Sequence, residues 1–416
     1  MAEGDRQTRR TWVGLFVIAL LIRGAWGVAY MSRAAEPTAL EFPDEEQYWR
    51  MAVSLRNGEG LRDELGFQAT RMPLYPGFLA LFAGMDSGIM VARVVQWFIG
   101  ALGSVFAAGL AATVFDSRRI GTLAGLIFAC DPFFIFFSSL LLTETLFVTL
   151  LCGLWWSIVR VWRREGLRLR TWIVVGIVSA LCIYTRESSV GLVILAMMIT
   201  VAIKRFQRKA VIGMLLAGSL VCTSLCPWAL RNHRVLGSWC WMTTRGGISL
   251  YDGVRPGAIG ESDLGDVKQM SAVQGLSEKQ WDEYFRGEAF RLIREDPGRI
   301  ASLALAKIGR MWNPVPNVET YRSTWVRLVA AVWMFPIMLL ALIGVVAWPM
   351  TRKPNGWKCV LLLLLPAIYL TLLHALFVGS VRYRLAAMPM LEILSAYALA
   401  AVILGRRPRL PEGRSE

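Results

Sequence analysis

The residues of this 416-residue chain best suited to chemistry lie in the run Phe-Pro-Asp-Glu-Glu-Gln-Tyr-Trp-Arg at positions 42–50. Asp44, Glu45 and Glu46 place three carboxylates together soon after the first apolar stretch. Beside a bilayer, desolvation raises carboxylate pKa values toward the range of a general base. The cluster is therefore the first candidate for such a base.

The same run also suits a structural role. Asp44 and Gln47 are spaced like a capping box, which closes the start of a short helix. Apolar side chains then recur at helical spacing and predict a helix lying flat on the membrane surface, at Tyr48, Met51, Ala52 and Leu55. Spacing alone leaves both interpretations of Asp44 open, helix cap and base.

Arg71 opens the run Arg-Met-Pro-Leu-Tyr-Pro-Gly-Phe at positions 71–78. Pro73 and Pro76 suit the first turn of a second interfacial helix. A cation is disfavoured at a helix N-terminus, and a phosphate held by free N–H groups together with Arg71 would resolve that conflict. The alternative is an arginine that only anchors the loop at the interface.

Several apolar stretches carry polar or ionisable groups near one end. Such groups are costly inside a membrane and usually face a cavity or each other. They are Asp131, Thr143, Glu144, Arg186, Glu187, Arg382 and Arg384, the last two beside Tyr383. For Arg186 and Glu187, pairing with neighbouring groups is the simpler interpretation.

Composition predicts that a membrane surrounds these residues. Hydrophobic residues make up 55% of the chain, charged residues 18%, and the mean hydropathy is +0.48. A helix needs roughly 20 apolar residues to cross the hydrocarbon. The sequence predicts an all-α polytopic membrane protein with about ten transmembrane helices. The candidate stretches are 12–31, 88–115, 120–137, 139–160, 171–186, 188–203, 210–228, 326–349, 359–378 and 384–404.

Lysine and arginine gather in short connections that ten spans would place on one side. Such connections stay in the cytoplasm, so topology accounts for much of the net charge of +15 and argues against a nucleic-acid partner. The first span has no clear cleavage site, and we expect it to stay as an anchor. The expected parts are a membrane module over 1–228 with an extracytoplasmic loop at 32–87, an extracytoplasmic region over 229–325, and C-terminal spans with a short cytoplasmic tail over 326–416.

Metal and cofactor motifs are missing from the sequence. Seven scattered cysteines with only His233 and His374 form no zinc pattern. There is also no phosphate-binding loop, dinucleotide fingerprint or nucleophile elbow. The sequence therefore supports no metal ligands and no particular cofactor, and assistance by a divalent metal stays an open alternative without support in the sequence.

Five motifs follow one another from one end of the chain to the other. They are P-D-E-x-x-Y-W at 43–49, R-M-P-L-Y-P-G-F at 71–78, L-L-T-E-T-L-F at 141–147, P-W-A-L-R-N-H-R-V-L-G at 227–237 and S-V-R-Y-R-L-A-A-M-P at 380–389. In this order they resemble the GT-C superfamily of integral-membrane glycosyltransferases. The resemblance is strongest to bacterial relatives of protein O-mannosyltransferases and of the lipid A aminoarabinose transferase.

The resemblance implies a fold, a reaction and a set of site residues. The first outer loop is expected to form two juxtamembrane helices, with Asp44 as the catalytic acidic residue and Glu45 beside it. A polyprenyl-phosphate sugar would place its phosphate near Arg71, Tyr75, Arg382 and Arg384. Asp44 would take the proton of an acceptor hydroxyl, with inversion at the sugar carbon. Further substrate-site candidates are Tyr48, Glu144, Arg186, Glu187 and Arg231.

The implied partners are this lipid-linked donor, membrane lipids and a lipid, glycan or protein acceptor, at the extracytoplasmic face of a bacterial inner membrane. Three other functions remain open. A transporter or flippase would favour midplane charges and repeated, broken helices. An O-antigen ligase or polymerase would carry its large outer loop late in the chain. In an assembly protein, the carboxylates would be replaceable.

Overall fold

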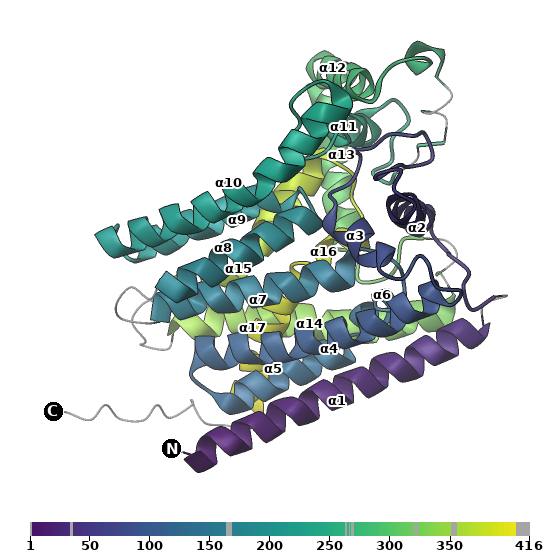
Figure 1. The fold of residues 1–416 in the computed structure, drawn as a ribbon. Helices are drawn as coiled ribbons and strands as arrows, with labels where there is room; N and C mark the ends of the chain where they lie inside the picture. The colour runs from purple at the N-terminus through teal and green to yellow at the C-terminus, as the bar shows by residue number, and fades with distance from the viewer. Residues whose placement is uncertain are drawn as a thin grey trace.

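The computed structural model is helical throughout the part of the chain that it describes, with no strand in that part. Apolar helices form a bundle, and shorter helices gather at one end of it (Figure 1). The described residues are 2–33, 36–163, 169–262, 264, 265, 267, 270–318, 321, 323–350 and 356–404.

Within the described residues, six helices are long and apolar enough to cross a membrane. They are α1 (Ala2–Arg33), α4 (Gly88–Phe115), α7 (Glu144–Arg163), α10 (Arg208–Leu236), α14 (Thr324–Met350) and α15 (Gly356–Leu376). Three further apolar helices are shorter, namely α8 (Leu169–Thr185), α9 (Ser189–Ile203) and α17 (Met388–Leu404). The protein is therefore a multi-pass membrane protein, and the all-α polytopic prediction is confirmed.

Two predicted spans are not single helices. The stretch 120–137 divides into α5 (Arg118–Cys130) and α6 (Pro132–Phe137). Asp131 is extended between them, because the residue before a proline avoids the helical region. Its carboxylate accepts the backbone N–H groups of Phe133 and Phe134 and so begins α6. At about 20 Å, α5 alone is too short to cross the hydrocarbon. The stretch 384–404 also combines two helices, because it begins at the last residue of α16 (Val381–Arg384), passes a turn at 385–387 and continues as α17. Each of the remaining eight stretches overlaps one helix.

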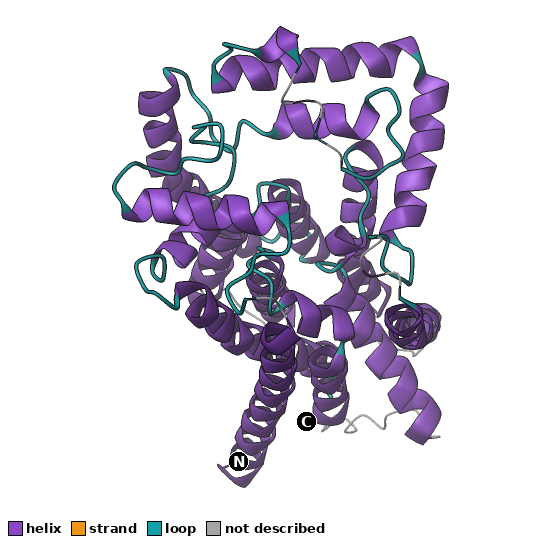
Figure 2. Cartoon of the chain, turned by 90° about the vertical axis from the view of Figure 1, so that its right-hand side faces the viewer, coloured by secondary structure: helices purple, strands orange, loops and turns teal. Residues whose placement is uncertain are grey.

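The helices that are not part of the bundle lie at the end of the bundle where α1 ends and α7 begins (Figures 1 and 2). The two helices expected in the first outer loop are present as α2 (Pro43–Arg56) and α3 (Leu74–Ala80). The later elements are α11 (Gly246–Val254), η2 (Ser271–Val273), α12 (Glu278–Glu295), α13 (Pro297–Met311) and α16 (Val381–Arg384).

The apolar face predicted for the first outer helix is buried. Tyr48, Met51 and Ala52 of α2 are each at most 5% exposed. The Tyr48 ring meets Tyr75 of α3 edge to face, with ring centroids 5.1 Å apart. Packing on this face fixes which way the first turn of α2 points, and that turn carries the three carboxylates.

Gly247 sets the distance between α11 and α12. Its N–H donates to the Asp282 side chain at 2.5 Å. A Cβ atom at this position would stand 2.0 Å from the Asp282 carbonyl oxygen, so only glycine fits without displacing backbone. This close approach positions Arg245, which directly precedes α11.

We expect Gly247→Ala to lower the thermal unfolding midpoint of the detergent-purified protein. Overpacking of this kind costs about 1–3 kcal/mol. Gly287→Ala in α12 is the matched control, because its Cβ would meet no atom within 4 Å and alanine favours the helix. Equal midpoints for the two variants would contradict the role of Gly247.

Candidate functional site

The first turn of α2 sends three consecutive carboxylates in three directions. Successive helical residues are turned by about 100°, so no two of them share a face. Glu46 is exposed and pairs with Arg50. Glu45 points inward and Asp44 points toward two arginines.

Asp44 joins two arginines that are far apart in sequence. One carboxylate oxygen accepts Arg71 Nη2 at 2.5 Å, and the other accepts Arg382 Nη1 at 2.5 Å. Burial opposes ionisation of Asp44, but Arg71 and Arg382 outweigh it and hold the pKa of this carboxyl well below its usual range. The side chains stay 15–29% exposed, so a ligand can reach the group.

Glu144 extends this chain of charges. One of its oxygens accepts Arg186 Nη2 at 2.8 Å and also Arg382 Nε. Arg382 therefore bridges Asp44 in the first turn of α2 and Glu144 at the start of α7. Arg71, Asp44, Arg382, Glu144 and Arg186 alternate in sign, which offsets much of the cost of desolvating each.

Gln47 joins a further arginine to this group. Its amide oxygen accepts Arg71 Nε at 2.8 Å and Arg245 Nη1 at 3.3 Å. Glu187 lies close enough to act on the charge of Arg71, and it accepts the Thr243 hydroxyl. With all groups ionised, four arginines (71, 186, 245, 382) against three carboxylates (44, 144, 187) leave one positive charge. Such a site favours an anion that can form charge-assisted hydrogen bonds.

Asp44 is not the helix cap that its spacing with Gln47 suggested. Phe42 is the N-cap, and the residue at N3 is Glu45, whose carboxylate accepts the Phe42 backbone N–H at 3.2 Å. The same oxygen accepts the Glu41 N–H, and the other accepts the Leu141 N–H at 2.6 Å. Glu45 is fully buried, so the expected catalytic role beside Asp44 does not match its position.

Arg384 does not point into the site as expected. It is fully buried and donates to the backbone carbonyls of Met311 and Asn313, with its guanidinium over the Phe133 ring. Residues two apart on a helix turn project on nearly opposite sides. Of the two arginines in α16, Arg382 is therefore the one that reaches Asp44.

Three other predicted site residues pack around the charged group or around the segments that carry it. Tyr75 is fully buried and donates to Gln96 at 2.7 Å. Arg231 donates to the Gln68 carbonyl at 2.7 Å and so holds the loop before Arg71. The Tyr48 ring lies under the Arg71 guanidinium, 4.9 Å from centroid to Cζ. Only Tyr48 of these touches the charged group.

Sequence reasoning missed Gln47 as a site residue, Arg245 and Glu278. Glu278 at the start of α12 accepts the N–H groups of Gln68 and Ala69 at 2.6 and 2.8 Å, and it also accepts the Thr244 hydroxyl. It thereby ties the start of α12 to the loop that carries Arg71. No spacing signal links positions 210 residues apart, although the sequence Ser277-x-x-Gln280 does mark the start of α12.

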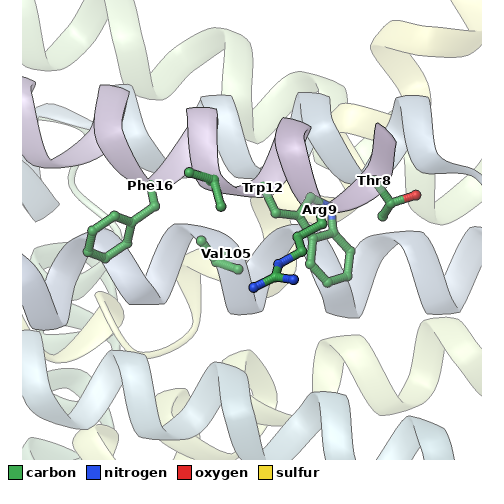
Figure 3. Close-up of a pocket in the computed structure, with 6 residues that line it drawn as sticks. Thr8, Arg9, Trp12, Phe16 and Val105 are labelled. Atoms are coloured by element: carbon green, nitrogen blue, oxygen red, sulfur yellow. The ribbon is translucent and has the colours of Figure 1, made fainter. Parts of the chain in front are cut away.

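A separate cavity of about 450 Å³ lies beside the N-terminal part of α1, away from these charges (Figure 3). It is lined by Thr8, Arg9, Trp12, Val13, Phe16 and Val105. Without a carboxylate in this lining, the cavity offers no general base. In the described part of the chain, no group of three His, Cys, Asp or Glu side chains is arranged to hold a metal ion.

Comparison with known proteins supports the predicted class. Residues 71–229 match the family model described as dolichyl-phosphate-mannose-protein mannosyltransferase. The oligosaccharyltransferase AglB of Archaeoglobus fulgidus, in complex with an inhibitory peptide and a dolichol-phosphate, has a similar structure, with TM-score 0.61 and 14% identity over 95% of this chain and 50% of AglB. The apo form of the A. fulgidus oligosaccharyltransferase gives TM-score 0.62 and 13% identity, over 95% and 51% of the two chains.

A weaker likeness is to ArnT of Cupriavidus metallidurans bound to undecaprenyl phosphate, with TM-score 0.40 and 15% identity over 95% of this chain and 78% of ArnT. A sequence comparison with curated proteins gives no match. The chain spans about half the length of the archaeal oligosaccharyltransferase. At these identities the structural likeness concerns the fold, and the chain has the fold of the GT-C membrane glycosyltransferases, as its motifs predict.

We expect Glu278→Gln to lower the thermal unfolding midpoint, because its new NH₂ group would face at least one of the N–H groups of Gln68 and Ala69. A buried donor left unsatisfied costs about 1–3 kcal/mol. Glu283→Gln on the same helix is the control, since that side chain is 57% exposed and makes a surface ion pair with Lys279. Equal effects in thermal unfolding would rule out the proposed tie.

Proposed function

We propose that this protein is a membrane glycosyltransferase that moves a sugar from a polyprenyl-phosphate donor to a hydroxyl group of a lipid, glycan or protein. The reaction would take place at the extracytoplasmic face of a bacterial inner membrane. The observation that carries the proposal is the Asp44 carboxylate held between Arg71 and Arg382 at the surface end of the bundle. The family match over residues 71–229 and the fold support the same class.

In this mechanism the donor phosphate binds to Arg71 and Arg382, and its polyprenyl tail stays in the bilayer. Guanidinium groups suit this task because they form paired, charge-assisted hydrogen bonds to phosphate oxygens. The acceptor oxygen attacks the anomeric carbon and its proton passes to Asp44. The bond between that carbon and the phosphate oxygen breaks, and the phosphate leaves with the electron pair. One displacement inverts the configuration.

Donor binding would also make Asp44 a better base. In the empty site, both guanidinium groups hold its pKa low. A phosphate competes for the same N–H donors and brings a like charge close to the carboxylate, and both changes raise the pKa. Asp44 thus gains basicity only when the donor is in place.

The other parts of the chain have supporting roles in this proposal. Residues 1–228 would form the catalytic membrane module, 229–325 would contact the acceptor, and 326–416 would supply Arg382. Arg186, Arg245, Glu144 and Glu187 would set the charge around the phosphate, and Glu45 would hold α2 against the segment before α7.

We expect Asp44→Asn to abolish transfer while leaving the fold intact, because an amide keeps the size of the side chain but cannot accept the proton. General bases contribute about 10²–10⁴ in rate. The measurement is mass spectrometry of glycans and lipids from cells with the gene deleted, then complemented with wild type, Asp44→Asn or the exposed control Glu46→Gln. Full restoration by Asp44→Asn would show that Asp44 is not the base.

Asp44→Asn should have opposite effects on transfer and on binding of the carrier, polyprenyl phosphate. Purified Asp44→Asn should bind polyprenyl phosphate more tightly than wild type, since the competing carboxylate is gone. Arg71→Ala and Arg382→Ala should each weaken binding by about 10–100-fold, as expected for a charged hydrogen bond worth about 1.5–3 kcal/mol, and lysine should be intermediate. Native mass spectrometry at several carrier concentrations measures this. Unchanged binding in both alanine variants would move the phosphate elsewhere.

A further inference from the structure

A second polar pocket lies at the opposite end of the helix bundle, where α7 and α9 end and α15 begins. Its volume is about 390 Å³, and its lining is Trp162, Ile203, Lys204, Arg205, Gln207 and Lys358. Glu144 begins α7 and Trp162 lies in its last turn, so the length of this helix, about 30 Å, separates the pocket from the charged site. Nothing in the proposed reaction uses it.

The lining of this pocket is basic. Three of its six residues are cations, they come from two segments about 150 positions apart, and none of the six is acidic. Basic connections alone reflect membrane topology and need only face water. Here, however, the fold brings Lys358 to the same concave surface as Arg205. Like charges repel, so the convergence of these two cations favours an anion between them.

The turn between α9 and α10 has an unusual backbone. Arg205 and Phe206 both lie in the left-handed region, with φ of 53° and 55°, although neither is glycine. This turn places Arg205 in the pocket and leaves Phe206 70% exposed beside it. Trp162 in the lining belongs to a residue type that is enriched at the interface with lipid headgroups. We therefore place the pocket at headgroup level.

We propose that this pocket binds the phosphate group of an anionic membrane lipid. Arg205 and Lys358 contact the phosphate oxygens, and the Gln207 amide adds a neutral hydrogen bond. Trp162 and Ile203 provide the apolar side of the pocket, against the glycerol and the first carbons of the acyl chains. Basic pockets between membrane helices suit such headgroups. The site is independent of the transfer reaction.

The test is native mass spectrometry of the detergent-purified full chain with dioctanoyl-phosphatidylglycerol. We expect Arg205→Gln/Lys358→Gln to bind it about 25-fold more weakly than wild type, from about fivefold for each cation near a membrane surface. The control is Arg119→Gln/Arg170→Gln, which removes the same charge from exposed positions at the same end of the bundle. This control should bind like wild type.

Two further ligands and one single variant distinguish the possible outcomes of this experiment. Dioctanoyl-phosphatidylcholine should bind all three proteins equally, because its headgroup has no net charge. Inorganic phosphate should not displace phosphatidylglycerol, and displacement would assign the pocket to a soluble phosphate in place of a lipid. The single variant Lys358→Gln, which leaves the α9–α10 turn intact, should weaken binding about fivefold. Equal binding by the pocket and control variants would overturn the proposal.

Discussion

The carboxylate of Asp44 joins two segments that are far apart in the chain. Arg71 lies between α2 and α3 and Arg382 lies in α16, and each donates to a different oxygen of the same side chain. Without Asp44 the two guanidinium groups would repel each other in a partly desolvated space. Through Arg382 and Glu144 the same contact extends to α7 and then to Arg186. Five charged groups thus fix four segments relative to one another.

The buried Glu45 side chain helps to hold this arrangement in place. Its buried carboxylate accepts the Leu141 N–H, three residues before Glu144. The contact between Glu45 and the Leu141 backbone is therefore a second connection between α2, which carries Asp44, and the segment that leads to Glu144. A carboxylate without exposed surface is stable only when its oxygens are hydrogen-bonded, and three backbone N–H groups meet that need. The neighbouring residue can then face the ligand.

Much of the fold could be predicted because membrane helices need long apolar stretches, and the sequence displays these directly. The break at Asp131 was missed because the hydropathy of 120–137 hides the effect of one proline on the preceding residue. Among the residues that meet in this charged group, the motifs name Asp44, Arg71 and Arg382 as candidates. They could not separate Arg382 from Arg384, since two arginines two positions apart differ only in the side of the helix turn that they occupy. Gln47, Arg245 and Glu278 depend on contacts between distant segments, which a single sequence does not reveal.

The charges of this site nearly cancel because its arginines have acidic partners, and this sets the terms on which an anion can bind. Burying unpaired arginines would cost several kcal/mol for each ion, so the carboxylates make the site stable before any ligand arrives. A ligand phosphate must then replace Asp44 as the partner of two guanidinium groups. Each such contact lowers the pKa of a carboxylate, so losing both would raise the pKa of Asp44 again. The group that stabilises the arginines thereby becomes a stronger base when the anion takes its place.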